Sequence, residues 1–258
     1  MTHQIITELI ASNAFELYGQ PKWTFGKNTC NTYEVFAEQV HLPGGATIPA
    51  WILLELIARD EDLTLIWSRW YLQAAIASAA DLSTKTHSHV TLSINLLPQY
   101  AALDDFVPQV LEVLEKTGFN PRKLQFELSE VQHLNQRGID NLNLLHDEHG
   151  VGLYLSNFGK GHANINLLSE VHFDGIELDR SFAAQIPDND QMVRLICAIQ
   201  NLADTLSLKV CAKGIETPDQ FDFFDQLKVF KGQGFIIGRP MPMDALLEYI
   251  NTYAVHAE

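Results

Sequence analysis

Strand-like and helix-like segments alternate from residue 90 to residue 238, and this alternation constrains the fold more than any other feature of the sequence. Short apolar runs are each followed by a turn and then by a stretch with helical periodicity. Strands are expected at 90–95, 123–130, 151–159, 173–179, 208–216 and within 232–238, and helices at 104–118, 140–149, 162–169, 189–206 and after Pro218. Such alternation is typical of a parallel sheet covered by helices. The number of strands favours an α/β fold closed as a (β/α)₈ TIM-like barrel.

The N-terminal part predicts a different start to the barrel. Two strands are expected at 15–21, ending at Pro21, and at 33–40, and the short connection between them favours an antiparallel pair. Helices are expected at 50–58 and 62–80. The chain has 258 residues and no long linker or low-complexity segment, so a single barrel domain over residues 1–258 is expected.

The charge balance argues against nucleic acid and membrane partners. Lysine and arginine total 17 against 32 aspartate and glutamate residues, which gives a formal net charge of −15. Such a surface repels phosphate backbones and anionic lipid headgroups, although a pocket can differ locally from the net charge. No apolar run approaches a membrane span, and the N-terminus has no basic region followed by an apolar block. We therefore expect a cytoplasmic location.

Polar residues follow the expected strands, where a barrel of this kind has its active site. The carboxyl ends of parallel strands meet at one mouth, so side chains from distant parts of the chain should converge there. These residues are Glu34, Asn95, Glu127 with Glu130, Ser156 with Asn157, Glu177 with Asp179, Lys213 with Glu216, and Gln233.

Several segments follow one another in a specific order. They are SINLLPQ at 93–99, ELSE at 127–130, NFGKGHANINLL at 157–168, ELDRSF at 177–182, KGIET at 213–217 and GQGFIIGRPMP at 232–242. Together they resemble the bacterial EAL-domain family, whose active members are cyclic di-GMP phosphodiesterases with a (β/α)₈-like barrel. The resemblance runs from about residue 15 to residue 250.

The resemblance implies a site for two Mg²⁺ or Mn²⁺ ions, held by carboxylates and an asparagine, that activate a water for hydrolysis. Glu34, Asn95 and Glu127 match family ligands. The family's paired aspartates fall on Ser156 and Asn157, a family glutamate falls on Lys213, and the catalytic lysine falls on Glu177. Two of five metal-facing carboxylates therefore remain, and no catalytic set is intact.

The size of the lost charge predicts an inactive member. Two unit charges about 4 Å apart interact by ~4 kcal/mol at an effective dielectric constant near 20, so losing three anions and gaining one cation weakens a two-metal site severely. No metal cofactor is expected, and at most one weakly held cation at Glu34, Asn95 and Glu127. The exchanged charges of Glu177 and Lys213 predict a direct ion pair, since the family order places them on adjacent strands.

The nucleotide pocket of the family is matched only in part. Gln20, Gln233, Arg239 and Pro240 agree with the pattern, but Glu38 stands where the family has a phosphate-facing arginine. Binding of cyclic di-GMP is therefore expected to be weak or absent. Three further acidic residues are interpreted as structural: Glu130, Asp179 and Glu216.

Three functions follow from these observations. The leading one is a catalytically inactive regulatory module that binds an unidentified regulatory protein, with a homodimer as one possible state. The alternatives are a non-hydrolysing cyclic di-GMP receptor and an active phosphodiesterase with a rearranged metal site.

His146 and His149, three residues apart without an indicated third ligand, are interpreted as surface residues. Phe221, Phe223, Phe224 and Phe230 predict core packing, of which an exposed part would suit a protein contact.

Overall fold

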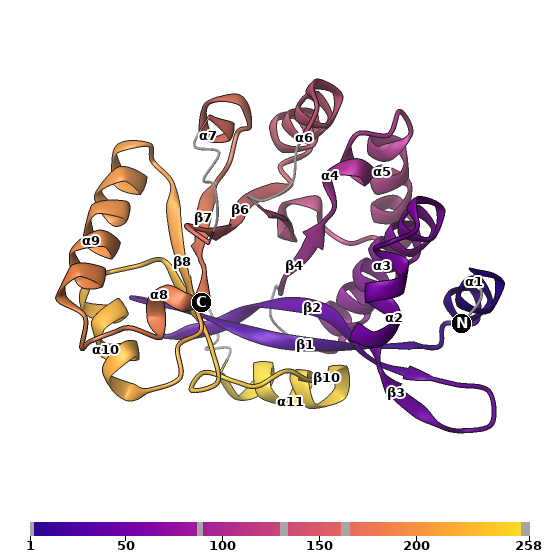
Figure 1. Ribbon diagram of the computed structural model, residues 1–258, viewed down its shortest axis with the longest axis horizontal. Helices are drawn as coiled ribbons and strands as arrows, with labels where there is room; N and C mark the ends of the chain where they lie inside the picture. The colour runs from indigo at the N-terminus through magenta and orange to yellow at the C-terminus, as the bar shows by residue number, and fades with distance from the viewer. Residues whose placement is uncertain (1–2, 87–89, 130–133, 161–165, 254–258) are drawn as a thin grey trace.

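The computed structural model describes residues 3–86, 90–129, 134–160 and 166–253, and these form a barrel of strands surrounded by helices (Figure 1). The ring of strands runs β1–β2–β4–β5–β6–β7–β8–β9 and closes where β9 pairs with β1. The strands from β2 to β9 run parallel around the ring, whereas β1 is antiparallel to both of its neighbours. This confirms the TIM-like barrel and the antiparallel first strand.

The strands of the ring are joined mostly by helices, as the alternation in the sequence predicts. The ring strands are β1 (Phe15–Thr24), β2 (Thr29–His41), β4 (Thr91–Leu96), β5 (Leu124–Ser129), β6 (Gly152–Phe158), β7 (Gly175–Leu178), β8 (Lys209–Lys213) and β9 (Lys231–Gln233). Two short strands extend the edges, β3 (Thr47–Pro49) beside β2 and β10 (Met241–Pro242) beside β1.

Most of the expected helices are present, with shifted boundaries. They are α2 (Ala50–Ile57), α3 (Glu61–Lys85), α5 (Phe106–Thr117), α6 (Gln136–His149), α7 (Leu167–Glu170), α9 (Asp190–Thr205) and α10 (Pro218–Gln226). Further helices that the sequence did not predict are α1 (His3–Ala11), α4 (Pro98–Ala101), η1 (Pro121–Lys123), α8 (Arg180–Ala183) and α11 (Met243–Tyr253). α1 and α11 are amphipathic; α1 packs beside α3, and α11 packs beside β1 and β2.

The prediction that Pro21 ends the first strand is wrong, because β1 continues to Thr24. Proline is tolerated in a strand where its missing N–H has no partner. β1 pairs with β10 at Tyr18 and Gly19 and with β9 from Trp23, so at Pro21 it has a partner strand only on the side of β2. The extra residues of β1 carry Lys22 into the barrel.

The core lies between the barrel and its helices and consists of one continuous cluster of buried apolar residues. Inside the barrel the ring is filled partly by charged side chains, including Lys22, Glu127 and Glu177, which are almost fully buried. No helix among the described residues is long and apolar enough to cross a membrane.

Candidate functional site

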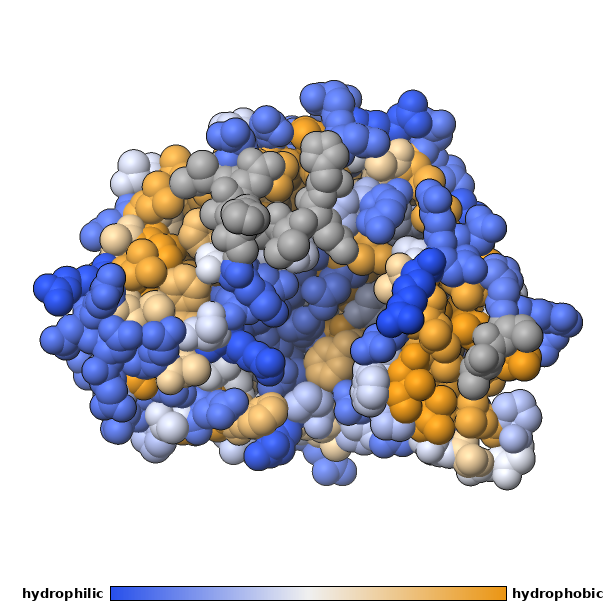
Figure 2. All heavy atoms as spheres, in the orientation of Figure 1, coloured by the Kyte–Doolittle hydropathy of each residue, from blue (hydrophilic) through white to orange (hydrophobic). Residues whose placement is uncertain are grey.

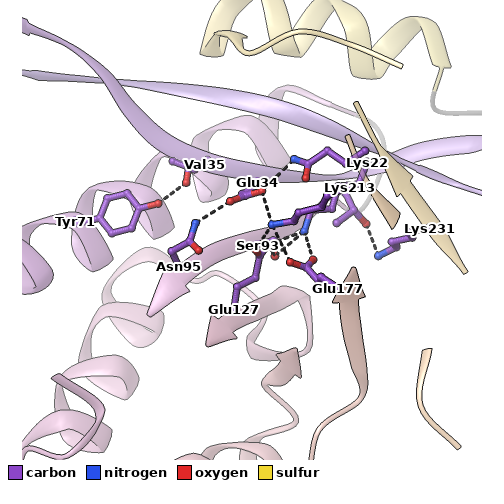
Figure 3. Close-up of polar contacts among 12 residues, drawn as sticks. Lys22, Glu34, Val35, Tyr71, Ser93, Asn95, Glu127, Glu177, Lys213 and Lys231 are labelled. Atoms are coloured by element: carbon purple, nitrogen blue, oxygen red, sulfur yellow. Dashed lines mark hydrogen bonds and ion pairs between the residues drawn. The ribbon is translucent and has the colours of Figure 1, made fainter. Parts of the chain in front are cut away.

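Five strands bring five charged side chains together inside the barrel, four from parallel strands and one from the antiparallel β1 (Figure 3). Lys22 comes from β1, Glu34 from β2, Glu127 from β5, Glu177 from β7 and Lys213 from β8. We refer to these residues as the lysine–glutamate cluster. Strand register fixes their levels, since Glu34 lies opposite Ser93 of β4, and Asn95 of β4 lies opposite Glu127.

Lys213 lies at the outer end of the cluster and contacts all three of its carboxylates. Its Nζ lies 3.1 Å from Glu34 Oε2, 2.6 Å from Glu127 Oε2 and 2.8 Å from Glu177 Oε2. The last distance confirms the predicted contact between Glu177 and Lys213, although the ion pair is part of a larger network than the exchange of two charges suggested. One ammonium group therefore holds carboxylates from three strands.

Lys22 forms the inner end of the cluster. Its Nζ lies 2.5 Å from Glu127 Oε1 and 2.6 Å from Glu177 Oε1, and it also donates to Ser93 Oγ at 3.3 Å. The side chain is 2% exposed. Glu127 and Glu177 are thus each bridged by two ammonium groups, one on each carboxylate oxygen.

The electrostatics of the cluster favour charged lysines. Burial lowers the pKa of Lys22 and Lys213, but the neighbouring carboxylates outweigh it, and both lysine pKa values are raised. Burial raises the pKa of Glu127, but Lys213 and Lys22 outweigh it and hold that pKa well below its usual range. Burial and the adjacent Glu127 raise the pKa of Glu177 despite the two lysines. Of these two glutamates, Glu177 therefore protonates more readily.

The sequence analysis missed Lys22 because it ended the first strand at Pro21. The signal that would have found it is the two-residue period of β1. Gln20 lines the mouth, and continuing the same face by one step places Lys22 inside the barrel.

Two amides extend the network around Glu34. Asn95 Nδ2 donates to Glu34 Oε1 at 2.7 Å, and Gln233 Nε2 donates to Glu34 Oε2 at 3.0 Å. Gln20 Nε2 donates instead to the backbone oxygen of Gly238 at 2.9 Å. The three residues predicted to hold a single cation, Glu34, Asn95 and Glu127, do lie together, with Lys213 Nζ bonded to both carboxylates.

Ser156 and Asn157 lie at the end of β6. Ser156 is buried, and its Oγ has no hydrogen-bond partner among the described residues. Asn157 adopts a left-handed conformation with φ of 57°, and the pairing of β6 with β7 is irregular here. An irregularity of this kind turns side chains at a strand end toward a new direction, and Asn157 lines the mouth.

A hollow of about 320 Å³ lies over the cluster. Besides cluster residues and both glutamines, it is lined by Lys160, Arg180 and the exposed ring of Phe235. The face seen in Figure 2 is hollowed near its centre, and hydrophilic residues line that hollow. Cations and an aromatic ring side by side suit an anionic ligand with a flat ring.

The remaining predicted pocket residues lie beside the hollow. The Arg239 guanidinium stacks 4.2 Å from the centre of the Phe235 ring, and Pro240 directly follows it. Glu38 is exposed on β2 and does not line the hollow, because β2 is irregular there and its partner strand skips this residue. The carboxylate that was expected to oppose a phosphate thus lies outside the hollow.

Asp179 both lines the hollow and caps the start of α8, where its carboxylate accepts from the backbone N–H of Ser181 at 3.0 Å. Burial raises the pKa of Asp179, but hydrogen bonds from Ser181 and the charges of Lys160 and Arg180 outweigh it, so this pKa is lowered. The Glu216 backbone N–H donates to Gln220 Oε1 at 2.7 Å, while its exposed side chain borders the hollow. Glu130 lies outside the described residues.

Comparison with known proteins identifies the barrel. The EAL domain family matches the chain over residues 3–240. An uncharacterized signaling protein of Caulobacter vibrioides is 30% identical over 239 residues, which is 92% of this chain and 29% of the relative. The cyclic di-GMP phosphodiesterase NbdA of Pseudomonas aeruginosa is 30% identical over 190 residues, which is 73% of this chain and 24% of NbdA. The chain thus spans less than a third of these relatives.

Solved structures share the fold at lower identity. The EAL enzyme Bd1971, bound to cAMP and cyclic di-GMP, superposes with a TM-score of 0.86 at 20% identity and covers 95% of this chain and 67% of that one. The FimX EAL domain of Pseudomonas aeruginosa, bound to cyclic di-GMP, superposes with a TM-score of 0.80 at 18% identity, covering 93% and 96% of the two chains.

Proposed function

The chain belongs to the EAL domain family of cyclic di-GMP signalling, and we propose that it is a member that does not hydrolyse the nucleotide and regulates by binding a protein partner. The proposal that the chain does not hydrolyse the nucleotide rests on the lysine–glutamate cluster. Two ammonium groups lie among the carboxylates to which the family resemblance assigns metal binding.

The cluster does not fit a pair of divalent cations. A hard dication binds oxygen at about 2.0–2.6 Å, so it would have to enter between the same oxygens that Lys213 Nζ and Lys22 Nζ contact. At about 3 Å and an effective dielectric constant near 20, a dication and an ammonium repel by roughly 10 kcal/mol. Both lysines are charged in this arrangement, because the neighbouring carboxylates raise the pKa of each.

Hydrolysis is tested by incubating the full chain with cyclic di-GMP and Mn²⁺ and separating linear product by chromatography. We expect no product above a protein-free control. Linear product that forms in proportion to the protein concentration, and that Lys213→Met changes, would establish the third function, an active phosphodiesterase with a rearranged site.

The proposal that the chain binds a protein partner is supported by exposed apolar residues away from the mouth. Trp51 and Ile52 of α2 are 61% and 38% exposed, and Figure 2 shows hydrophobic residues gathered over this part of the molecule. A contiguous exposed apolar patch is typical of a protein contact. The predicted phenylalanine region contributes a smaller one, since Phe221 lines an apolar hollow with Trp23 and Tyr253.

A photo-crosslinking residue placed at position 51 in the cell tests this contact. We expect one dominant adduct that is absent when the same residue replaces Glu148, which is exposed on α6. The same adducts from both positions, or none from position 51, would contradict a partner at α2.

A second function, a receptor that binds cyclic di-GMP without cleaving it, is favoured by the lining of the hollow. Lys160, Arg180 and Phe235 offer two cations and a ring to a nucleotide with phosphates and purines. Calorimetric titration with cyclic di-GMP, with and without Mg²⁺, separates the two functions. Metal-independent binding that Arg180→Ala abolishes and Arg122→Ala leaves unchanged would establish the receptor.

A further inference from the structure

Two histidines and an aspartate converge at the end of the barrel opposite the mouth. His146 and Asp147 lie in the last turn of α6, and His172 lies in the segment that leads into β7. His146 Nδ1 lies 2.9 Å from Asp147 Oδ1, and His172 Nδ1 lies 3.0 Å from the same oxygen. Three potential ligand atoms from two elements therefore face one point.

From this geometry we infer a binding site for one Zn²⁺ ion, held by His146 Nδ1, His172 Nδ1 and an oxygen of Asp147. Zinc takes imidazole nitrogens and carboxylate oxygens at about 2.0–2.2 Å in tetrahedral geometry, which separates ligand atoms by roughly 3.3 Å. The two nitrogen-to-oxygen distances are a few tenths of an ångström shorter, and all three ligand atoms lie within 4.8 Å of one another, so a small adjustment of the group admits the ion. The fourth position faces solvent and is filled by water, because the His172 side chain is 55% exposed.

Neighbouring residues hold the ligands in place. The Asp174 carboxylate lies 3.7 Å from His146 Nε2, on the side of the ring away from the proposed ion. A carboxylate in this place favours the proton on Nε2 and leaves Nδ1 free for a metal. Asp174 is itself fixed, since its carboxylate accepts from the backbone N–H of Leu153 at 3.1 Å.

The segment that carries His172 is tied to α6 by Asn143. The Asn143 side chain accepts from the backbone N–H of His172 at 2.9 Å and donates to the backbone oxygen of Glu170 at 2.9 Å. His172 is therefore presented to α6 before any metal binds.

The sequence did not reveal this group, because the spacing of His146 and His149 on one helix suggested a pair without a third ligand. The structure selects different partners. His149 is not part of the group, and the second histidine comes from 26 positions further along the chain.

Calorimetric titration of the EDTA-treated full chain with ZnCl₂ tests the site. His3 lies near Asp60 and Asp62 in a second group that could bind a metal, so every variant also carries His3→Gln. We expect one Zn²⁺ per chain, at least tenfold weaker binding in His172→Gln and in Asp147→Asn, and unchanged binding in the matched control His149→Gln. Zinc should also raise the Tm of the control and not that of His172→Gln, since a ligand that binds the native state stabilises it.

Both substituted side chains are largely exposed, so melting without zinc should be the same in all variants. Zinc binding in His172→Gln that is as tight as in His149→Gln would overturn the inference. Absence of zinc binding in the His3→Gln background would do the same. Neither result bears on hydrolysis at the mouth.

Discussion

Glu127 and Glu177 show how one buried cluster gives two similar side chains opposite roles. Each carboxylate contacts both lysines, yet the pKa of Glu127 is held well below its usual range, whereas that of Glu177 is raised. Burial and the neighbouring Glu127 disfavour the charge of Glu177, whereas at Glu127 the two lysines outweigh burial.

We therefore expect Glu127→Gln and Glu177→Gln to differ strongly in stability. Removing the charge of Glu127 leaves two buried lysines short of a partner and should lower the free energy of unfolding by about 3–5 kcal/mol. Removing that of Glu177 takes away a charge that burial and Glu127 already disfavour, and should cost less than half as much. Urea denaturation at pH 7 of the two isosteric variants measures the difference, and equal losses would contradict this account of the cluster.

The pH dependence of the two variants should also differ in sign. The contribution of Glu127 is present above its ordinary pKa of 4.5 and is lost only in acid, as the pH falls through its lower native value. Protonated Glu177 contributes stability below that ordinary pKa, and this is lost as the pH rises through its raised native value. Glu177→Gln should therefore gain stability relative to the wild type on going from pH 5 to pH 8, and Glu127→Gln should not.

Helix α10 shows how an element next to the site is positioned. It follows β8, which carries Lys213, and begins at Pro218. Its N-cap residue is Thr217, whose side chain accepts from the backbone N–H of Gln220. The Gln220 side chain in turn accepts from the Thr217 backbone N–H at 3.1 Å. This reciprocal capping box fixes where the helix starts.

Thr217→Ala should lower the free energy of unfolding by about 1 kcal/mol, because it leaves a first-turn N–H without its side-chain partner. Thr205→Ala is the matched control, since Thr205 ends α9 and only bonds back to the Asn201 oxygen within its helix. Thermal or urea unfolding should show little change in the control. Equal destabilisation by both substitutions would show that the cap does not set the stability of this region.

The elements that the sequence predicted are determined by local sequence pattern, whereas those that it missed are determined by contacts between distant residues. Strands such as β4 and β6 are apolar runs bounded by turns, and Gly118 and Gly150 end their helices in left-handed conformations, so local pattern sufficed. The course of β1 past Pro21 depends on which neighbours β1 has, and these are set by barrel closure. The same holds for Lys22 and for the pairing of His146 with His172. Contacts between distant strands are therefore where the sequence alone fell short.

The whole molecule retains the fold of its family, with two ammonium groups among the carboxylates of the barrel mouth. The backbone superposes on the EAL enzyme Bd1971 with a TM-score of 0.86. Substitutions on β6, β7 and β8, at Ser156, Asn157, Glu177 and Lys213, distinguish this mouth from the two-metal pattern that the family resemblance implies. If electrostatics alone distinguishes this mouth from a two-metal site, negative charge restored on these strands should restore affinity for metal ions.

We expect the triple variant Ser156→Asp, Asn157→Asp and Lys213→Glu to bind Mn²⁺ at least about a hundredfold more tightly than the wild type. It adds two anions and converts a cation into an anion beside Glu34 and Glu127, and each such pair is worth ~4 kcal/mol at 4 Å. Calorimetric titration with MnCl₂ measures the change. A control variant makes the same types of substitution at exposed positions, namely Ser207→Asp, Asn201→Asp and Lys27→Glu. If this control gained as much affinity as the mouth variant, net charge rather than the arrangement of ammonium groups would govern cation binding, and the basis for proposing a non-hydrolysing barrel would fail.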